Sequence, residues 1–132
     1  MTPLTKDQKE ELYAQAEMVW EQLGVNNSPD YVEEVSRFVD SLHGQPWTEK
    51  ELNTLAMRIG AYLGRAMLSR HSGRWYYEEE RQNYAVKFNR VDVVAYPMTK
   101  AYKHLTNGTS DSIATMYWGI DAIINDKLNN GQ

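Results

Sequence analysis

Two arginines stand out in the segment LAMRIGAYLGRAM, residues 55–67, because the chain around them is mostly apolar or small. Arg58 and Arg65 lie seven residues apart with Tyr62 between them, so a helix carries both arginines along one edge. A guanidinium can bind a carboxylate or a phosphate through two parallel hydrogen bonds. Together with Arg74, these residues predict the walls of a site for a small anionic ligand.

The charge distribution offers a competing role for the arginines. Residues 1–47 hold three Lys or Arg and nine Asp or Glu, a net charge of −6, whereas the whole chain carries −4. Ion pairs between Arg58 or Arg65 and these acidic residues are therefore the favoured interpretation. The acidic segment also disfavours nucleic-acid binding, which needs a basic surface, and it suits a basic protein partner.

The residue types that carry catalysis or bind metals lack the necessary spacing. His43, His71 and His104 are far apart, and none belongs to a His-x-x-x-His or Glu-x-x-His pair of the kind that binds zinc. The chain has no Cys and no Gly-x-Ser-x-Gly nucleophile motif. The run from Glu78 to Glu80 is typical of a solvated hairpin turn. We therefore expect no metal, no cofactor and no enzymatic activity.

Aromatic residues outside the apolar stripes are candidates for an interface with a partner. Trp47, Trp75, Tyr76 and Trp118 lie in expected loops, at strand edges or on the polar side of the last helix. Trp and Tyr dominate the binding energy of many protein interfaces, but they also fill protein cores. The sequence leaves both roles open, because exposure decides between them.

Three helices are expected in the first half of the chain. Apolar spacing and start signals predict them over about residues 5–23, 28–42 and 48–71. Ser28 is the expected cap of the second helix, and Thr48–Glu51 is a capping box for the third. The third helix is apolar on two sides, which is typical of a helix buried between neighbours.

Small residues recur on this third helix. Ala56, Gly60 and Gly64 are four positions apart, so they form one ridge. Glycine inside a helix costs about 1 kcal/mol relative to alanine, and close packing can offset that cost. We therefore expect the final helix or the sheet to approach this ridge closely.

The second half of the chain changes to short aromatic and β-branched runs. The segments RWYYEE, YAVKFN and VDVVAY, within residues 74–96, predict a three-stranded antiparallel meander packed on the third helix. A short helix follows over about residues 99–106. The last helix is expected from about Asp111, with Ser110 or Asp111 as its cap.

The elements combine into an expected single α+β domain over residues 1–132. It has a helical part over 1–72, a strand meander over 74–96 and C-terminal helices over 98–129. No apolar run approaches the ~20 residues that span a bilayer, and the first residues lack the order of a signal peptide. A cytoplasmic location and no membrane partner are therefore expected.

Five short motifs carry a family resemblance. They are GAYLG (60–64), GRW (73–75), YP (96–97), KxLxNG (103–108) and DSIATMY (111–117). In this order and spacing, over about residues 48–118, they resemble a family of small bacterial proteins described as a domain of unknown function. The resemblance implies a bacterial cytosolic protein of α+β type, and it transfers no catalytic residues.

These observations favour a protein-interaction domain without enzymatic activity. Small acidic bacterial proteins of this kind are sometimes immunity partners of secreted toxins, so a basic protein or toxin is the expected partner. One alternative is a small anionic-ligand-binding domain, or an uncharacterised enzyme, with its site between the helix over 48–71 and the sheet. Another is a structural subunit of a homo-oligomer.

Overall fold

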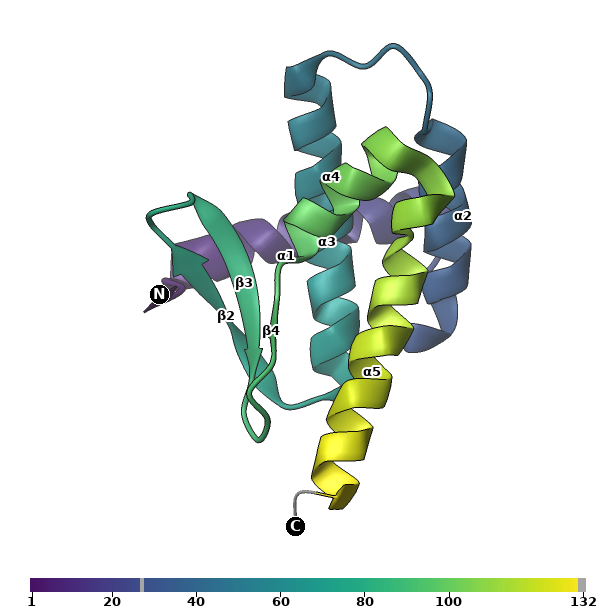
Figure 1. Ribbon diagram of the computed structural model, residues 1–132. Helices are drawn as coiled ribbons and strands as arrows, with labels where there is room; N and C mark the ends of the chain where they lie inside the picture. The colour runs from purple at the N-terminus through teal and green to yellow at the C-terminus, as the bar shows by residue number, and fades with distance from the viewer. Residues whose placement is uncertain (27, 131–132) are drawn as a thin grey trace.

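The computed structural model describes residues 1–26 and 28–130, which form five α-helices and a four-stranded antiparallel sheet. In chain order the elements are β1 (Thr2–Pro3), α1 (Lys6–Leu23), a 3₁₀ turn (Pro29–Tyr31), α2 (Val32–Leu42), α3 (Glu49–Arg70), β2 (Gly73–Glu78), β3 (Asn83–Phe88), β4 (Val94–Ala95), α4 (Pro97–Asn107), a second 3₁₀ turn (Gly108–Asp111) and α5 (Ile113–Asn130). Figure 1 shows α3 in the middle, with the sheet on one side and α2 and α5 on the other. The predicted α+β class is confirmed.

The sheet contains the predicted meander and one further strand. β2, β3 and β4 pair antiparallel in chain order, with Trp75 opposite Val86 and Val86 opposite Ala95. β1 pairs with Tyr76–Tyr77 on the other side of β2. The sheet therefore has four strands and not three. Thr2–Pro3 is too short to show an alternating apolar pattern, so the sequence gives no sign of it.

α1 and α3 begin with the same reciprocal capping box. The Thr5 hydroxyl accepts a hydrogen bond from the Gln8 N–H, and the Gln8 side chain accepts one from the Thr5 N–H. Thr48 and Glu51 repeat this arrangement at the start of α3. Two backbone donors are thus satisfied at each helix start, and the predicted positions of both helices are confirmed.

α2 begins at Val32 and not directly after Ser28. The Ser28 hydroxyl accepts a hydrogen bond from the Asp30 N–H at 3.3 Å, and the backbone then makes a 3₁₀ turn over Pro29–Tyr31. The predicted start of this helix is therefore too early by one turn. The valines of its predicted seam are buried, and they are Val32, Val35 and Val39.

The ridge of small residues on α3 meets two different neighbours. A methyl group added at Gly60 would lie 2.6 Å from the Cα of Met98, and one added at Gly64 would overlap the indole ring of Trp75. The sheet approaches the ridge at Gly64 through Trp75 of β2, as predicted. The helix that approaches is α4 and not the predicted final helix, because α4 begins at Pro97, immediately after the sheet ends.

The last helix is capped one or two residues later than predicted. α5 begins at Ile113, and the Ser112 hydroxyl accepts a hydrogen bond from the Ala114 N–H at 3.2 Å. The predicted caps, Ser110 and Asp111, belong to the preceding 3₁₀ turn. In the described part of the chain, no helix is both long enough and apolar enough to cross a bilayer.

Candidate functional site

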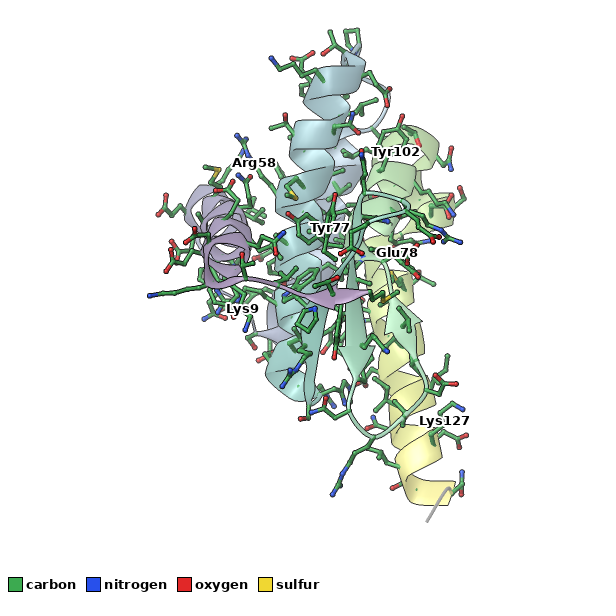
Figure 2. The ribbon with its side chains drawn as sticks, turned by 90° about the vertical axis from the view of Figure 1, so that its left-hand side faces the viewer. Lys9, Arg58, Tyr77, Glu78, Tyr102 and Lys127 are labelled. Carbon is green, nitrogen blue, oxygen red and sulfur yellow. The ribbon has the colours of Figure 1, made fainter. Side chains whose placement is uncertain are left out.

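The structure separates the four residues that were predicted to bind an anion. Tyr62 is completely buried, and burial raises the pKa of its hydroxyl above the usual value. Arg74 is exposed on β2, and Arg58 lies on the α1 side of α3 (Figure 2). Arg65 borders a small hollow between α1, α3 and β2, and the other three residues do not line that hollow.

Neither Arg58 nor Arg65 makes the ion pair that the composition favoured. The Cζ atom of Arg65 lies 4.2 Å from the ring centroid of Tyr13 and 4.8 Å from that of Trp20, both on α1. Among the described residues, no carboxylate lies within ion-pair distance of Arg65 or Arg58. The favoured interpretation is therefore wrong. Although α1 has many acidic residues, the side chains of α1 that contact Arg65 are aromatic rings.

The hollow beside Arg65 has a volume of about 170 Å³. Its lining residues are Tyr13, Arg65, Leu68, Ser69 and Trp75. Trp75 is only 3% exposed, and its Nε1–H has no hydrogen-bond partner among the described residues. The buried Nε1–H of Trp20, which packs on Arg65, also has none. This junction is therefore rich in N–H donors, and none of the described residues that line the hollow is acidic.

A larger, open groove of about 710 Å³ lies between the first half of α3, the β2–β3 turn and α4. Its apolar lining comes from Ala56, Met57, Tyr84 and Met98. The groove is close to the predicted position between the helix over 48–71 and the sheet. However, α4 forms a third wall, and none of the four predicted residues lines the groove.

Several polar side chains of this groove already bond to one another. The Asn83 side-chain amide donates to the Thr99 hydroxyl at 2.8 Å, and the Tyr102 hydroxyl donates to the Glu49 carboxylate at 2.7 Å. Tyr102 lies on α4 (Figure 2), and its bond to Glu49 raises its pKa. Glu49 and Lys103 are the charged lining residues, so the groove shows no preference for anions.

A His–Asp pair joins α2, α4 and α5, and His and Asp are two of the three residue types of a catalytic triad. His104 is fully buried, its Nε2 lies 2.5 Å from Asp40 Oδ1, and its Nδ1 accepts the Ile113 N–H at 3.1 Å. Because Nδ1 is an acceptor, the proton is on Nε2 and is donated to Asp40. The hydroxyls of Ser36 and Ser112 lie 3.0 Å apart. Both ring nitrogens are occupied, so neither can take a proton from a serine.

A second His–Asp pair fixes the end of α3 to α5. His71 Nε2 lies 2.6 Å from Asp121 Oδ1, and Arg70 Nε lies 3.1 Å from the same oxygen. The described residues contain no group of three His, Cys, Asp or Glu side chains that could hold a metal ion. Both pairs were missed in the sequence, because their members are far apart in the chain and follow no motif.

The four aromatic residues predicted to form an interface have different environments. Trp75 is a core residue and not an interface residue, since it is buried against α3. Trp47 is half-buried, and its indole N–H donates to a backbone carbonyl at the end of α2 at 2.7 Å. Tyr76 is half-buried on β2. Trp118 is 40% exposed, so it is the strongest interface candidate of the four.

Trp118 belongs to an exposed surface that we call the α2–α5 face. Its residues are Glu33 of α2 and Trp118, Gly119, Ala122 and Ile123 of α5. The Trp118 Nε1–H donates to Glu33 Oε1 at 3.1 Å, which holds the indole across the two helices. Ile123 is 47% exposed. Sequence reasoning missed Glu33 and Ile123, although Ile123 falls outside the core stripe of the last helix.

The candidate binding surfaces belong to the described part of the chain. They are the α2–α5 face, the groove beside α4 and the hollow beside Arg65. Comparisons of the chain with protein-family models, with curated proteins and with solved structures find no match.

Proposed function

We propose that this chain is a protein-interaction domain without enzymatic activity, and that it binds a basic protein through the α2–α5 face. The observation that carries the proposal concerns the exposed glutamates of α1 and α2, which make no ion pair with any described residue. Unpaired surface charge of one sign attracts a partner of the opposite sign and speeds their encounter.

The acidic charge of the exposed glutamates on the first two helices is available to a partner, because described residues do not neutralise it through ion pairs. The exposed glutamates are Glu10, Glu11, Glu17, Glu21, Glu33 and Glu34. Arg65 was the expected counter-charge, but it packs on aromatic rings. The net charge of −6 over residues 1–47 is therefore not cancelled by the central helix.

Trp118 supplies an anchor beside the acidic charge of α2. Its indole is held by Glu33 and meets the Tyr117 ring edge-on, with the ring centroids 4.9 Å apart. A side chain that is already ordered loses little conformational entropy when a partner binds. Ala122 and Ile123 extend the apolar surface along α5. An aromatic anchor beside acidic residues suits a basic partner with an apolar patch.

The two His–Asp pairs also support a binding role. Each is used to join helices, because His104 bonds to α2 and α5 and His71 bonds to α5. His104 is fully buried, and both of its ring nitrogens are already bonded.

We further propose that the partner is a toxin and that the chain is an immunity-type protein of the bacterial cytoplasm. A basic toxin would be neutralised when the α2–α5 face covers the surface that the toxin needs. The absence of Cys from the sequence is compatible with a reducing compartment.

Affinity capture with the immobilised full chain, followed by binding measurements on the captured protein, tests the proposal. We expect a basic protein whose binding weakens as salt rises, because exposed charges are screened. Trp118→Ala should weaken binding about 30-fold, which corresponds to roughly 2 kcal/mol. Glu33→Gln should weaken it less and reduce the salt dependence.

Two control variants keep this test specific. Met18→Ala removes a similarly exposed apolar side chain from α1, and Glu80→Gln removes an exposed carboxylate from the β2–β3 turn. Both should bind like the unchanged chain. An acidic partner, or one that Trp118→Ala binds equally well, would refute the proposal. A dimer that depends on Trp118 in size-exclusion chromatography would favour a homo-oligomer instead.

A further inference from the structure

We infer that the hollow beside Arg65 binds a small oxyanion, either a carboxylate or a phosphate group, where α1 and α3 meet β2. The inference is independent of the α2–α5 face, because β2 lies across α3 from α2 and α5 (Figure 1). It rests on a positioned guanidinium, on buried N–H donors without acceptors and on the size of the hollow.

The Arg65 guanidinium is positioned before any ligand arrives. The rings of Tyr13 and Trp20 pack against it at 4.2 and 4.8 Å. Stacking of this kind uses the π faces of the rings and leaves the guanidinium N–H groups for hydrogen bonds in its own plane. Two of those N–H groups match the two oxygens of a carboxylate or phosphate. In the described part of the chain, no carboxylate makes an ion pair with Arg65.

Two buried indole N–H groups point to the same kind of ligand. Trp75 lines the hollow and is 3% exposed, and Trp20 contacts Arg65. Neither Nε1–H has an acceptor among the described residues. A buried donor without an acceptor costs about 1–3 kcal/mol, and such groups usually bond to a water or an ion. An oxyanion in the hollow would lie beside the Trp75 indole and would give Arg65 a counter-charge.

The lining and the volume define the class of ligand. The hollow has a guanidinium and no acidic side chain in its lining, so it disfavours cations. Its volume of about 170 Å³ is far smaller than the roughly 710 Å³ of the groove beside α4. This space holds a group of a few heavy atoms, such as an inorganic phosphate or the carboxylate end of a larger molecule. It does not hold a whole nucleotide.

The four indole N–H groups of the chain allow a direct test by ¹H–¹⁵N NMR. Trp→Phe variants assign the signals, and the labelled full chain is titrated with sodium phosphate or sodium acetate, with sodium chloride at equal ionic strength as the reference. We expect saturable shifts of the Trp75 and Trp20 signals. The signals of Trp47 and Trp118 should stay in place, because those N–H groups already donate to a backbone carbonyl and to Glu33. The anion that saturates at the lower concentration identifies the ligand as phosphate or carboxylate.

Arginine variants make the test specific to this hollow. Arg65→Gln should abolish the saturable shifts, whereas Arg65→Lys, which keeps the charge but loses the two-pronged geometry, should weaken binding about tenfold. Arg74→Gln is the control, because Arg74 is exposed on β2 and does not line the hollow. Unchanged Trp47 and Trp118 signals show that a variant is folded. If Arg65→Gln is not folded, the affinity of Arg65→Lys for the anion tests the proposal instead. The proposal is overturned if neither anion shifts Trp75 more than chloride does, or if folded Arg65 variants bind as tightly as the unchanged chain.

Discussion

His104 bonds to a different helix through each of its ring nitrogens. Nε2 donates to Asp40 on α2, and Nδ1 accepts the backbone N–H of Ile113, the first residue of α5. The first N–H groups of a helix have no acceptor within that helix. His104 therefore caps α5 together with Ser112, and it fixes the place where α5 begins relative to α2 and α4.

We predict that His104→Ala lowers the free energy of unfolding by about 2–5 kcal/mol, because it leaves a void and removes the bonding partner of Asp40 and of the Ile113 N–H. Urea unfolding followed by tryptophan fluorescence measures the change. His43→Ala is the matched control. His43 is exposed and its Nδ1 lies 2.9 Å from the Leu105 carbonyl oxygen, so we expect a loss of about 1 kcal/mol or less. Equal losses in the two variants would contradict the role given to His104.

Predictions about single residues failed where they depended on burial. Trp75 and Tyr62 were expected to face a partner or a ligand, and both lie in the core. Residue type could not separate these roles, because Trp and Tyr serve cores and interfaces alike. The partner of Arg65 depends on which side of α1 faces α3, which composition does not encode. His104 was missed because Asp40 is 64 positions away from it in the chain.

Predictions about helices and strands succeeded because their signals are local. The capping boxes at Thr5 and Thr48 mark the starts of α1 and α3, and alternating apolar residues mark β3. The elements that were missed are a two-residue strand and two 3₁₀ turns, which are too short to show any period. The third wall of the groove, which α4 forms, could not be predicted either, because it brings together elements from distant parts of the chain.

We predict that Gly64→Ala destabilises the protein by about 1–3 kcal/mol, although alanine is the better helix former by about 1 kcal/mol. The added methyl group would overlap the Trp75 ring, which is itself held edge-on against Tyr84 with ring centroids 6.4 Å apart. Gly60→Ala should also destabilise the protein, because the added methyl group would clash with the backbone of Met98, which cannot move aside as a flexible side chain can. Thermal unfolding followed by far-UV circular dichroism measures both changes.

Gly119→Ala is the matched control for these two variants. Gly119 also lies inside a helix, but a methyl group added there meets no atom within 4 Å. Its replacement should raise the stability by up to about 1 kcal/mol, through helix propensity alone. If Gly64→Ala were stabilising as well, the close approach of β2 to α3 would be disproved.

At the scale of the whole molecule, two buried tyrosines link stability to alkaline pH. Burial raises the pKa of Tyr62, and it raises that of Tyr117 to about 12, with the charge of Asp121 adding to the effect on Tyr117. The usual tyrosine pKa is about 10. Above that pH the unfolded chain loses phenolic protons that the folded chain keeps.

We therefore predict that the two protonated tyrosines contribute fully to the free energy of unfolding below about pH 10. As the pH rises further, the free energy of unfolding decreases. The slope is at most about 1.4 kcal/mol per pH unit for each tyrosine. Urea titrations from about pH 9 to about pH 11 measure it. Tyr117→Phe and Tyr62→Phe should each make the decrease less steep. A slope that neither variant changes would show that other groups cause the alkaline loss.

β1 holds the start of the chain to the sheet through Thr2 and Pro3, whose partners Tyr77 and Tyr76 lie far along the sequence. Proline has no N–H to give to the ladder. Because β1 pairs through only two residues and one of them is proline, it has few hydrogen bonds to lose, so it opens far more readily than the core. Each opening uncovers the outer edge of β2, with the aromatic pair Tyr76 and Tyr77 beside it. Exposed strand edges pair with other chains, so concentrated solutions of this protein should aggregate edge to edge while its helices are still folded.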